Sequence, residues 1–392
     1  MTDDIEKFSY AEDTNVRSIS SKIQHGTYKF SAAKGVALEK PNKPGSIRPI
    51  VIPRARDRIV QRCILDALIS DQAIKTEAFQ PTSFGGIPKQ EGDKFAGVPA
   101  AINALLGVLA KGNSHVIIGD ISSFFSNIKK SDAVNKIISH CNDQKFINLF
   151  QSAIEIDLAN HEDIWQHKEA FPYGDIGVGQ GVCLSPFLGN LVLSDFDKEM
   201  NAGDCVCLRY IDDIIIIAPS GKAASARLRK ARQLLAQLGM EFAEDKTSPA
   251  PIEASQKFDY LGIEFFNGLL RPSKRSRSSI IRRSAEVAAK SLQSIRSTQS
   301  INEFNNQYSI SKTLSKISGM SRGWANHYRF CNDIETIRNV DRQIASNFLD
   351  YSHKATAIAE KKIADGNPDL AAAYLGYQGI SQVSFSPFTW TR

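Results

Sequence analysis

The chain has 392 residues, of which 42% are hydrophobic and 23% charged, with a formal net charge of +6 and a pI near 8.9. This length suits two or three domains, and the composition excludes a disulfide-stabilised miniprotein and a largely disordered chain. No apolar run reaches the ~18 residues of a membrane-spanning helix, and the acidic start lacks the pattern of a secretory signal. The six cysteines form no C-x-x-C pair. We therefore expect reduced thiols in a cytoplasmic protein with no membrane partner.

The first half of the chain predicts a mixture of strands and helices. Residues 1–40 are polar and end at a Pro- and Gly-rich breaker, which indicates an N-terminal extension. A short strand is expected over 46–53, and the apolar spacing predicts an amphipathic helix over 56–69. Glycines and prolines between 85 and 99 predict a loop, which precedes a small apolar helix near 100–110. His115–Asp120 is expected to be a buried strand that ends on a carboxylate, followed by weaker helical patterns up to Pro172.

The middle of the chain predicts a helix and then a hairpin. After a glycine-rich segment at 174–181, apolar spacing predicts one helix whose shared face carries Leu184, Leu188, Leu191 and Asp195. An alternating strand then ends at Tyr210, and residues 214–218 form a fully apolar strand. Between them stand Asp212 and Asp213, so we expect a hairpin with two acids at its tip.

A strongly basic stretch follows. Residues 271–296 contain eight basic side chains and one acidic one. Helical spacing within this stretch predicts a packed face of Ile281, Ala285, Ala288, Leu292 and Ile295. The basic side chains would then lie on the outer face of that helix, where they could bind phosphates. The pattern of residues 378–392 predicts no element.

Three aspartates form the candidate chemical site. Asp212 and Asp213 at a hairpin tip, together with Asp120 at the end of a strand, provide the hard oxygen ligands that Mg²⁺ prefers. In two-metal phosphoryl transfer such ions stabilise the attacking and the leaving oxygen. Neighbouring strand residues point to opposite faces, so Asp212 and Asp213 converge only if the chain turns there. An isolated Asp-Asp pair is usually a solvated turn, but the apolar strands on both sides favour a metal site here.

These residues resemble the motifs of reverse transcriptases. Tyr210–Asp213 resembles the Y-x-D-D box, Asp120–Phe125 is similar to the D-[IV]-x-x-F-F box, and Gly179–Pro186 is similar to the P-Q-G-x-x-L-S-P box. Further similarity to group II intron-type enzymes lies in four short segments, which are 48–61, Lys246-Thr247, Phe258–Gly262 and Gly323–Tyr328. The chain shows no nuclease-like cluster after them. It most resembles the stand-alone, defence-associated ("unknown group") reverse transcriptases of bacteria.

The resemblance implies an α+β right-hand polymerase. Its fingers and palm would combine an antiparallel sheet with helices, and its thumb would be α-helical. The implied parts are an N-terminal extension (1–40), fingers (41–115), a palm (116–268, with a fingers insertion at about 128–172), a thumb (269–350) and a C-terminal tail (351–392).

The resemblance also implies residue roles. Asp120, Asp212 and Asp213 would be catalytic and, with the backbone carbonyl of Ile121, would bind two Mg²⁺ ions, for which Mn²⁺ could substitute. The residues implied for dNTP binding are Arg48, Arg54, Phe125, Gln180 and Lys246. Among them Phe125 would be a steric gate against the 2′-hydroxyl, and Lys246 would be the general acid for pyrophosphate. The implied nucleic-acid contacts are Tyr210, Gly262, Arg271, Lys274, Arg275, Arg277, Arg282 and Arg283.

The implied function is an RNA-directed DNA polymerase (nucleotidyltransferase) in antiphage defence. Its substrates would be dNTPs, its template a structured non-coding RNA, and its product a DNA/RNA duplex, with a second polymerase or effector subunit as a further partner. Gly179 replaces the family's proline, and its backbone freedom leaves template-independent or protein-primed synthesis open, with Tyr374 and Tyr377 as primers. A maturase-like RNA-binding protein is a third alternative, and Phe125 disfavours an RNA-synthesising enzyme.

Overall fold

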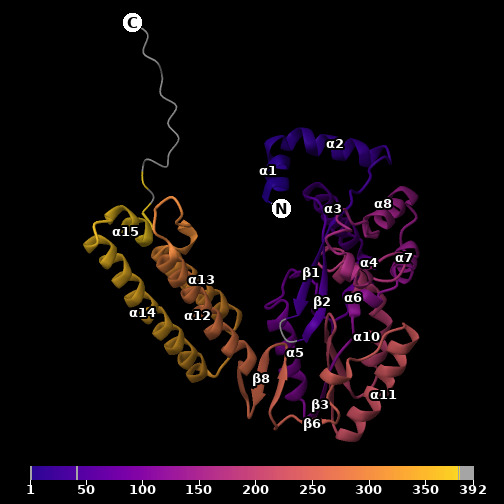
Figure 1. Ribbon diagram of the computed structural model, residues 1–392. Helices are drawn as coiled ribbons and strands as arrows, with labels where there is room; N and C mark the ends of the chain where they lie inside the picture. Colours follow the sequence, from indigo (N-terminus) through magenta and orange to yellow (C-terminus); the bar gives the residue numbers. More distant parts are fainter. Residues whose placement is uncertain (1, 41–42, 378, 380–392) are drawn as a thin grey trace. The chain divides into compact units, whose positions relative to one another are not determined.

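The computed structural model describes residues 2–40, 43–377 and 379, and it divides into two compact units. Unit 1 is Met1–Ala254 and unit 2 is Ser255–Arg392. Helices and antiparallel sheets occur in both units (Figure 1), which confirms the predicted α+β class. Residues 41–42 of the predicted breaker and most of 378–392 lie outside the described residues. Within the described ranges we find no helix with the length and apolar character needed to cross a membrane.

Unit 1 begins with two helices and a hairpin. The elements are α1 (Thr2–Tyr10), α2 (Glu12–Gln24), β1 (Lys34–Lys40) and β2 (Lys43–Ile52). The strand predicted at 46–53 is thus longer, and its antiparallel partner β1 lies within the predicted N-terminal extension. The predicted helix at 56–69 is confirmed as α3, and the next helices are α4 and α5, with bounds Ala55–Ser70, Gln72–Ala78 and Val98–Leu109.

A four-stranded antiparallel sheet forms the centre of unit 1. Its strand order is β4-β5-β3-β6, and the bounds are β3 (His115–Asp120), β4 (Val206–Tyr210), β5 (Asp213–Ala218) and β6 (Ile252–Glu253). Strand β5 pairs with both β3 and β4, and its residues 214–218 are all buried. A strand with neighbours on both edges and packing on both faces needs this continuous apolar run. Helix α11 (Gly221–Gln237) packs against β3 and β5 (Figure 1).

Several short helices complete unit 1. They are α6 (Phe124–Asn127), α7 (Lys130–Ile138), α8 (Gln144–Ile154), the 3-10 helices η1 (Trp165–Ala170) and η2 (Glu244–Lys246), α9 (Ser185–Val192) and α10 (Ser194–Met200). The single helix predicted through Asp195 is wrong, because the chain breaks at Leu193 into α9 and α10. Leu184, Leu188 and Leu191 are buried, whereas the side chain of Asp195 is exposed and pairs with Lys136. The break interrupts the helical register that the apolar spacing assumes.

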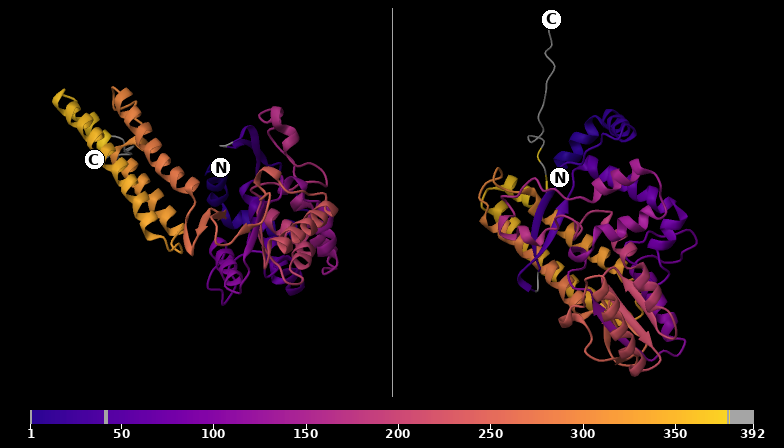
Figure 2. Two further views of the ribbon diagram at one scale, coloured as in Figure 1. Left: turned by 90° about the horizontal axis from the view of Figure 1, so that it is seen from below. Right: turned by 90° about the vertical axis from the view of Figure 1, so that its right-hand side faces the viewer.

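Unit 2 combines a small sheet with a helical bundle. The sheet contains β7 (Phe258–Tyr260), β8 (Ile263–Phe266) and β9 (Leu269–Pro272) in that order. The helices are α12 (Lys274–Ser297), the 3-10 helix η3 (Asn306–Tyr308), α13 (Ile310–His327), α14 (Ile334–Ala364) and α15 (Pro368–Leu375). Both views of Figure 2 show the long helices of this unit lying side by side. The implied border between thumb and tail, at residue 350, falls inside α14.

The buried face of α12 differs from the predicted one. Its buried positions are Ile280, Ser284, Ala288, Ser291 and Ile295, while Ala285 is exposed. Ser291 can lie in the core because its hydroxyl donates to the Tyr308 carbonyl at 2.6 Å and lies 2.7 Å from the Tyr351 hydroxyl. Hydrogen-bonded serines are compatible with burial, and apolar spacing alone does not detect them.

A polar cluster around Glu77 ties α4 to α7 and α10. The Glu77 carboxylate accepts hydrogen bonds from Lys136 Nζ at 2.9 Å, Lys198 Nζ at 2.6 Å and the Ser194 hydroxyl at 2.5 Å. Burial by itself would raise the pKa of Glu77, but the hydrogen bonds from Lys198, Ser194 and Lys136 outweigh it and lower the pKa to about 2. The ionised carboxylate therefore stabilises unit 1.

Glu77→Gln should lower the free energy of unfolding at pH 7 by about 1–3 kcal/mol, because two ammonium groups lose their charged acceptor. The folded pKa of about 2 lies below the ordinary value of 4.5, so this contribution is complete above pH 4.5 and disappears as the pH falls toward 2. Urea unfolding at pH 7, 5 and 3 measures it. The matched control is Glu199→Gln, which removes an exposed partner of Lys230 and should change stability less. An equal loss for Glu77→Gln at pH 7 and pH 3 would contradict the assignment.

Candidate active site

The central sheet brings the three predicted aspartates together. Strands β3 and β5 pair in a register that sets Asp120 opposite Asp213. Asp212 lies in the turn between β4 and β5, and its backbone carbonyl accepts a hydrogen bond from the Ile121 N–H at 3.0 Å. The turn that Asp212 and Asp213 need in order to converge is therefore present. All three carboxylates lie at one end of the sheet.

The electrostatics of this site favour a cation. Burial, followed by the negative charges of Asp212 and Asp120, raises the pKa of Asp213 to about 7, although the positive charge of Lys246 opposes this. Burial and the charge of Asp120 likewise raise the pKa of Asp212, while the positive charges of Lys246 and Arg48 oppose this. Lys246 Nζ donates to Asp120 Oδ1 at 2.7 Å. Carboxylates crowded in this way keep their charge most easily beside a positive partner.

The donor set fits a hard divalent ion. Among the residues that the structure describes, no three His, Cys, Asp or Glu side chains are already arranged as a metal-binding cluster, and Lys246 occupies one oxygen of Asp120. Oxygen donors with excess negative charge are nevertheless what Mg²⁺ and Mn²⁺ prefer. Asp120, Asp212 and Asp213 would hold the ion beside Ile121. When bound, such an ion supplies Lewis-acid stabilisation of phosphate charge.

Phe124 and Phe125 have different environments. Phe124 is buried and packs so closely on Gly189 that a Cβ there would come within 2.7 Å of its ring. Phe125 is only partly buried, and with Gly181, Val182 and Pro186 it lines a cavity of about 730 Å³. Of the two rings, Phe125 is therefore the one that borders open space.

Two of the other implied dNTP-binding residues, Gln180 and Arg54, precede Gly181 and Ala55, which line this cavity. The Gln180 carbonyl accepts a hydrogen bond from the Val51 N–H at 2.8 Å, which joins the glycine-rich segment to β2. Arg48 is exposed on β2, and its charge acts on Asp212. Arg54 is exposed at the N-cap of α3.

Gly179 lies in a closely packed environment. A Cβ at this position would approach Val182 at 2.9 Å, and Ile156 and Val51 at 3.1 Å each. Its carbonyl also accepts a hydrogen bond from the Ser185 hydroxyl at 2.7 Å. The close packing thus favours glycine at position 179, and the effect of its backbone freedom on template use stays a prediction.

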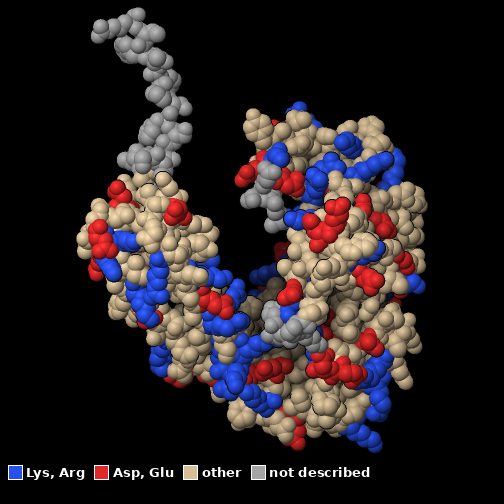
Figure 3. Space-filling view, in the orientation of Figure 1, with Lys and Arg blue, Asp and Glu red and all other residues tan. Residues whose placement is uncertain are grey.

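The implied nucleic-acid residues of unit 2 fall into two groups. Lys274, Arg275, Arg282 and Arg283 are exposed, and Figure 3 shows several basic side chains on the visible surface of this unit. Arg271 and Arg277 are instead directed to the buried carboxylate of Glu264, at 2.5 Å and 3.7 Å. Their charges neutralise this buried acid, and their contact with nucleic acid stays a prediction. Gly262 has a φ of +76° and lines a cavity with Arg275, Arg283 and Trp324.

Tyr210 pairs with Asp213 across the hairpin, and burial followed by the charge of Asp213 raises the pKa of its hydroxyl. The tyrosine thus packs beside the carboxylates.

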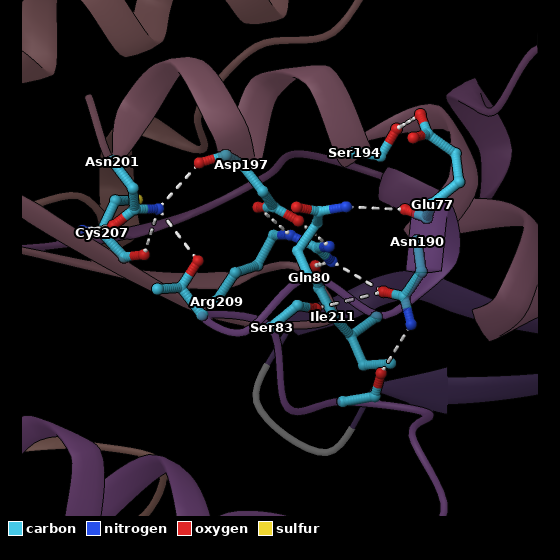
Figure 4. Close-up of polar contacts among 12 residues, drawn as sticks. Glu77, Gln80, Ser83, Asn190, Ser194, Asp197, Asn201, Cys207, Arg209 and Ile211 are labelled. Carbon is cyan, nitrogen blue, oxygen red and sulfur yellow. Dashed lines mark hydrogen bonds and ion pairs between the residues drawn. The ribbon is translucent and has the colours of Figure 1, made fainter. Parts of the chain in front are cut away.

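The sequence analysis missed a buried polar network beneath the hairpin. Its centre is Arg209, whose side chain is 0% exposed and donates to both carboxylate oxygens of Asp197, at 2.8 Å and 2.5 Å (Figure 4). The same guanidinium donates to Asn190 Oδ1 and to the Ile211 carbonyl, each at 3.0 Å. An arginine inside an otherwise apolar strand is the signal that could have revealed it.

Gly179→Ala should lower the free energy of unfolding by about 1–3 kcal/mol, because the added methyl overpacks against Val182, Ile156 and Val51. The matched control is Gly107→Ala in α5, where a Cβ meets nothing within 4 Å and alanine favours the helix. Urea unfolding should therefore give changes of opposite sign. Unchanged stability for Gly179→Ala would show that the backbone there is free to move.

Comparisons with known proteins show which family this chain is similar to. Residues 38–265 match the family model described as reverse transcriptase (RNA-dependent DNA polymerase). Protein YkfC of Escherichia coli K12 is 30% identical over 187 residues, which are 47% of this chain and 44% of YkfC. The group II intron-encoded protein LtrA of Lactococcus lactis is 24% identical over 186 residues, covering 47% of this chain and 28% of LtrA. The chain thus matches less than half the length of these relatives.

Among solved structures, apo telomerase from Candida tropicalis aligns with a TM-score of 0.43 and 14% identity over 88% of this chain and 69% of that chain. The family model covers more than half of the residues. The chain therefore belongs to the reverse transcriptase (RNA-dependent DNA polymerase) family.

Proposed function

We propose that the protein is an RNA-directed DNA polymerase that uses two Mg²⁺ ions. The observation that carries this proposal is the convergence of Asp120, Asp212 and Asp213 at one end of the sheet, in a chain of this family. The raised pKa values of Asp212 and Asp213 support it, because they result from burial and from neighbouring negative charges, and a bound cation would offset both effects.

Other residues of unit 1 support selection and transfer of a deoxynucleotide. Phe125 borders the cavity beside Gly181, where its ring would oppose a 2′-hydroxyl. Lys246 lies 2.7 Å from Asp120, so its ammonium group is close enough to the site to protonate a pyrophosphate leaving group. Arg48 would add positive charge for a triphosphate.

The exposed basic residues of α12, in unit 2, would bind the phosphates of a DNA/RNA duplex.

The template and the biological role follow from the family resemblance. We propose a structured non-coding RNA as template, antiphage defence as the role, and the cytoplasm as the location, on the similarity to stand-alone bacterial enzymes. A second polymerase or effector subunit would be a further partner. Protein-primed synthesis by Tyr374 is not supported, because this tyrosine is fully buried and its hydroxyl donates to the Thr298 carbonyl at 2.8 Å. Tyr377 is 61% exposed and stays the candidate primer for that alternative.

Replacing Asp212 and Asp213 together by Asn should reduce dNTP incorporation on an RNA template by about 10³-fold or more, because the ligands of the ions lose their charge. The fold should be retained or stabilised at pH 8, since ionised carboxylates with raised pKa values oppose folding above their ordinary pKa. Primer extension and thermal unfolding measure the two effects. Asp195→Asn on α10 is the matched control and should keep full activity. Synthesis retained by the double variant would refute the proposed site.

Sequencing the RNA and DNA that copurify with the protein from its host tests the template. One abundant RNA, with complementary DNA only in the active form, is the expected result. DNA that matches no copurified RNA would favour template-independent or protein-primed synthesis. RNA without DNA in either form would favour a maturase-like binding protein.

A further inference from the structure

The residue between Tyr210 and Asp212 has an unusual backbone conformation. Ile211 has a φ of +62°, in the left-handed region that β-branched residues strongly avoid. It is the first residue of a two-residue turn, where a positive φ is normally provided by glycine. A conformation of this kind persists only where the surrounding structure enforces it. The contacts of Ile211 should therefore reveal what holds the carboxylate-bearing turn.

Arg209 holds this turn from inside the protein. One nitrogen, Nη1, donates to the Ile211 carbonyl at 3.0 Å and to Asn190 Oδ1 at 3.0 Å. Nε and Nη2 donate to the two oxygens of Asp197, on α10. Both side chains of this ion pair are buried. Because both oxygens of Asp197 hold the planar guanidinium, its hydrogen bond to the Ile211 carbonyl has a fixed direction.

Gly85 holds the same residue from the other side. A Cβ on Gly85 would come within 2.5 Å of the Ile211 side chain and 2.6 Å of its backbone nitrogen. The Gly85 carbonyl accepts a hydrogen bond from Asn190 Nδ2 at 3.0 Å, and Ser83 donates to Asn190 Oδ1 at 3.4 Å (Figure 4). Asn190 thus joins Gly85 to Arg209, and both of these residues contact Ile211. We call Gly85, Asn190 and Arg209 the clamp.

We propose that Arg209 is a positioning residue, which sets the direction of the Asp212 and Asp213 carboxylates by holding the Ile211 carbonyl. This inference rests on the proposed function, since it gives the clamp a role in metal binding. Mg²⁺ requires near-ideal octahedral ligand geometry, so a small rotation of the turn weakens binding of the ion. A lysine at position 209 would keep the charge opposite Asp197. Its single ammonium group cannot reproduce the planar fork that also reaches Asn190 and Ile211.

The test compares Arg209→Lys with the wild type by Mn²⁺ binding, primer extension and thermal unfolding. Mn²⁺ titration of the full-length protein, followed by electron paramagnetic resonance, should show about tenfold weaker binding. Primer extension should show a kcat lowered by about 10- to 100-fold, with the KM for dNTP changed less than about threefold. Gly85→Ala is the second variant, because it displaces Ile211 while leaving every charge in place. It should give the same pattern if Arg209→Lys does not fold.

The matched control is Asn201→Ala. Asn201 belongs to the same network, where it bonds Thr82, the Asp197 carbonyl and Cys207, but it makes no bond to Ile211. This variant should lower Tm and leave Mn²⁺ affinity and kcat unchanged. If Arg209→Lys or Gly85→Ala lowers Tm alone, or Asn201→Ala weakens Mn²⁺ binding equally, the positioning role is overturned. Mn²⁺ binding can be measured without turnover. If the wild type binds Mn²⁺ but makes no DNA, the proposed polymerase function is refuted, whereas the effect of Arg209→Lys on Mn²⁺ affinity still tests the positioning role.

Discussion

The pairing of β5 with both β3 and β4 is the constraint on which the candidate site depends. Pairing with β3 sets Asp120 opposite Asp213, and the turn into β5 places Asp212 beside them. Strand β5 can be central because residues 214–218 are apolar and buried. The packing of the sheet and the placement of the carboxylates are therefore consequences of the same register. A slip by one residue would turn Asp213 to the opposite face.

Placing three carboxylates close together is electrostatically unfavourable, and neighbouring positive charges offset part of this repulsion. Burial of the carboxylates at one end of the sheet, followed by the repulsion between them, raises the pKa values of Asp212 and Asp213. Lys246 provides one positive partner by its contact with Asp120. Below the turn, by contrast, Arg209 and Asp197 neutralise each other out of contact with solvent. The three aspartates thus carry negative charge that Lys246 balances only in part, whereas the buried Arg209–Asp197 pair beneath them is neutral.

Local patterns of the sequence predict the carboxylate site because its parts are local. Asp212 and Asp213 stand between two strands of recognisable apolar pattern, and β3 ends visibly on Asp120. Arg209 stands out as an arginine in an apolar strand, but its partners could not be predicted in the same way, since Asp197 and Asn190 come from two other helices. Likewise, the spacing of charges in α12 does not reveal that Glu264 on β8 takes Arg271 and Arg277. The environments of these arginines depend on partners that are distant in the sequence, so the pattern of a single segment does not predict them.

We propose Asp120, Asp212 and Asp213 as the ligands of divalent ions. Crystals of the protein grown with Mn²⁺ and a dNTP would allow the ions to be located by anomalous scattering. We predict two peaks at this end of the central sheet, within bonding distance of the three aspartates, with Lys246 displaced from Asp120. A structure in which Lys246 stays on Asp120 and no peak lies beside Asp212 or Asp213 would contradict the account.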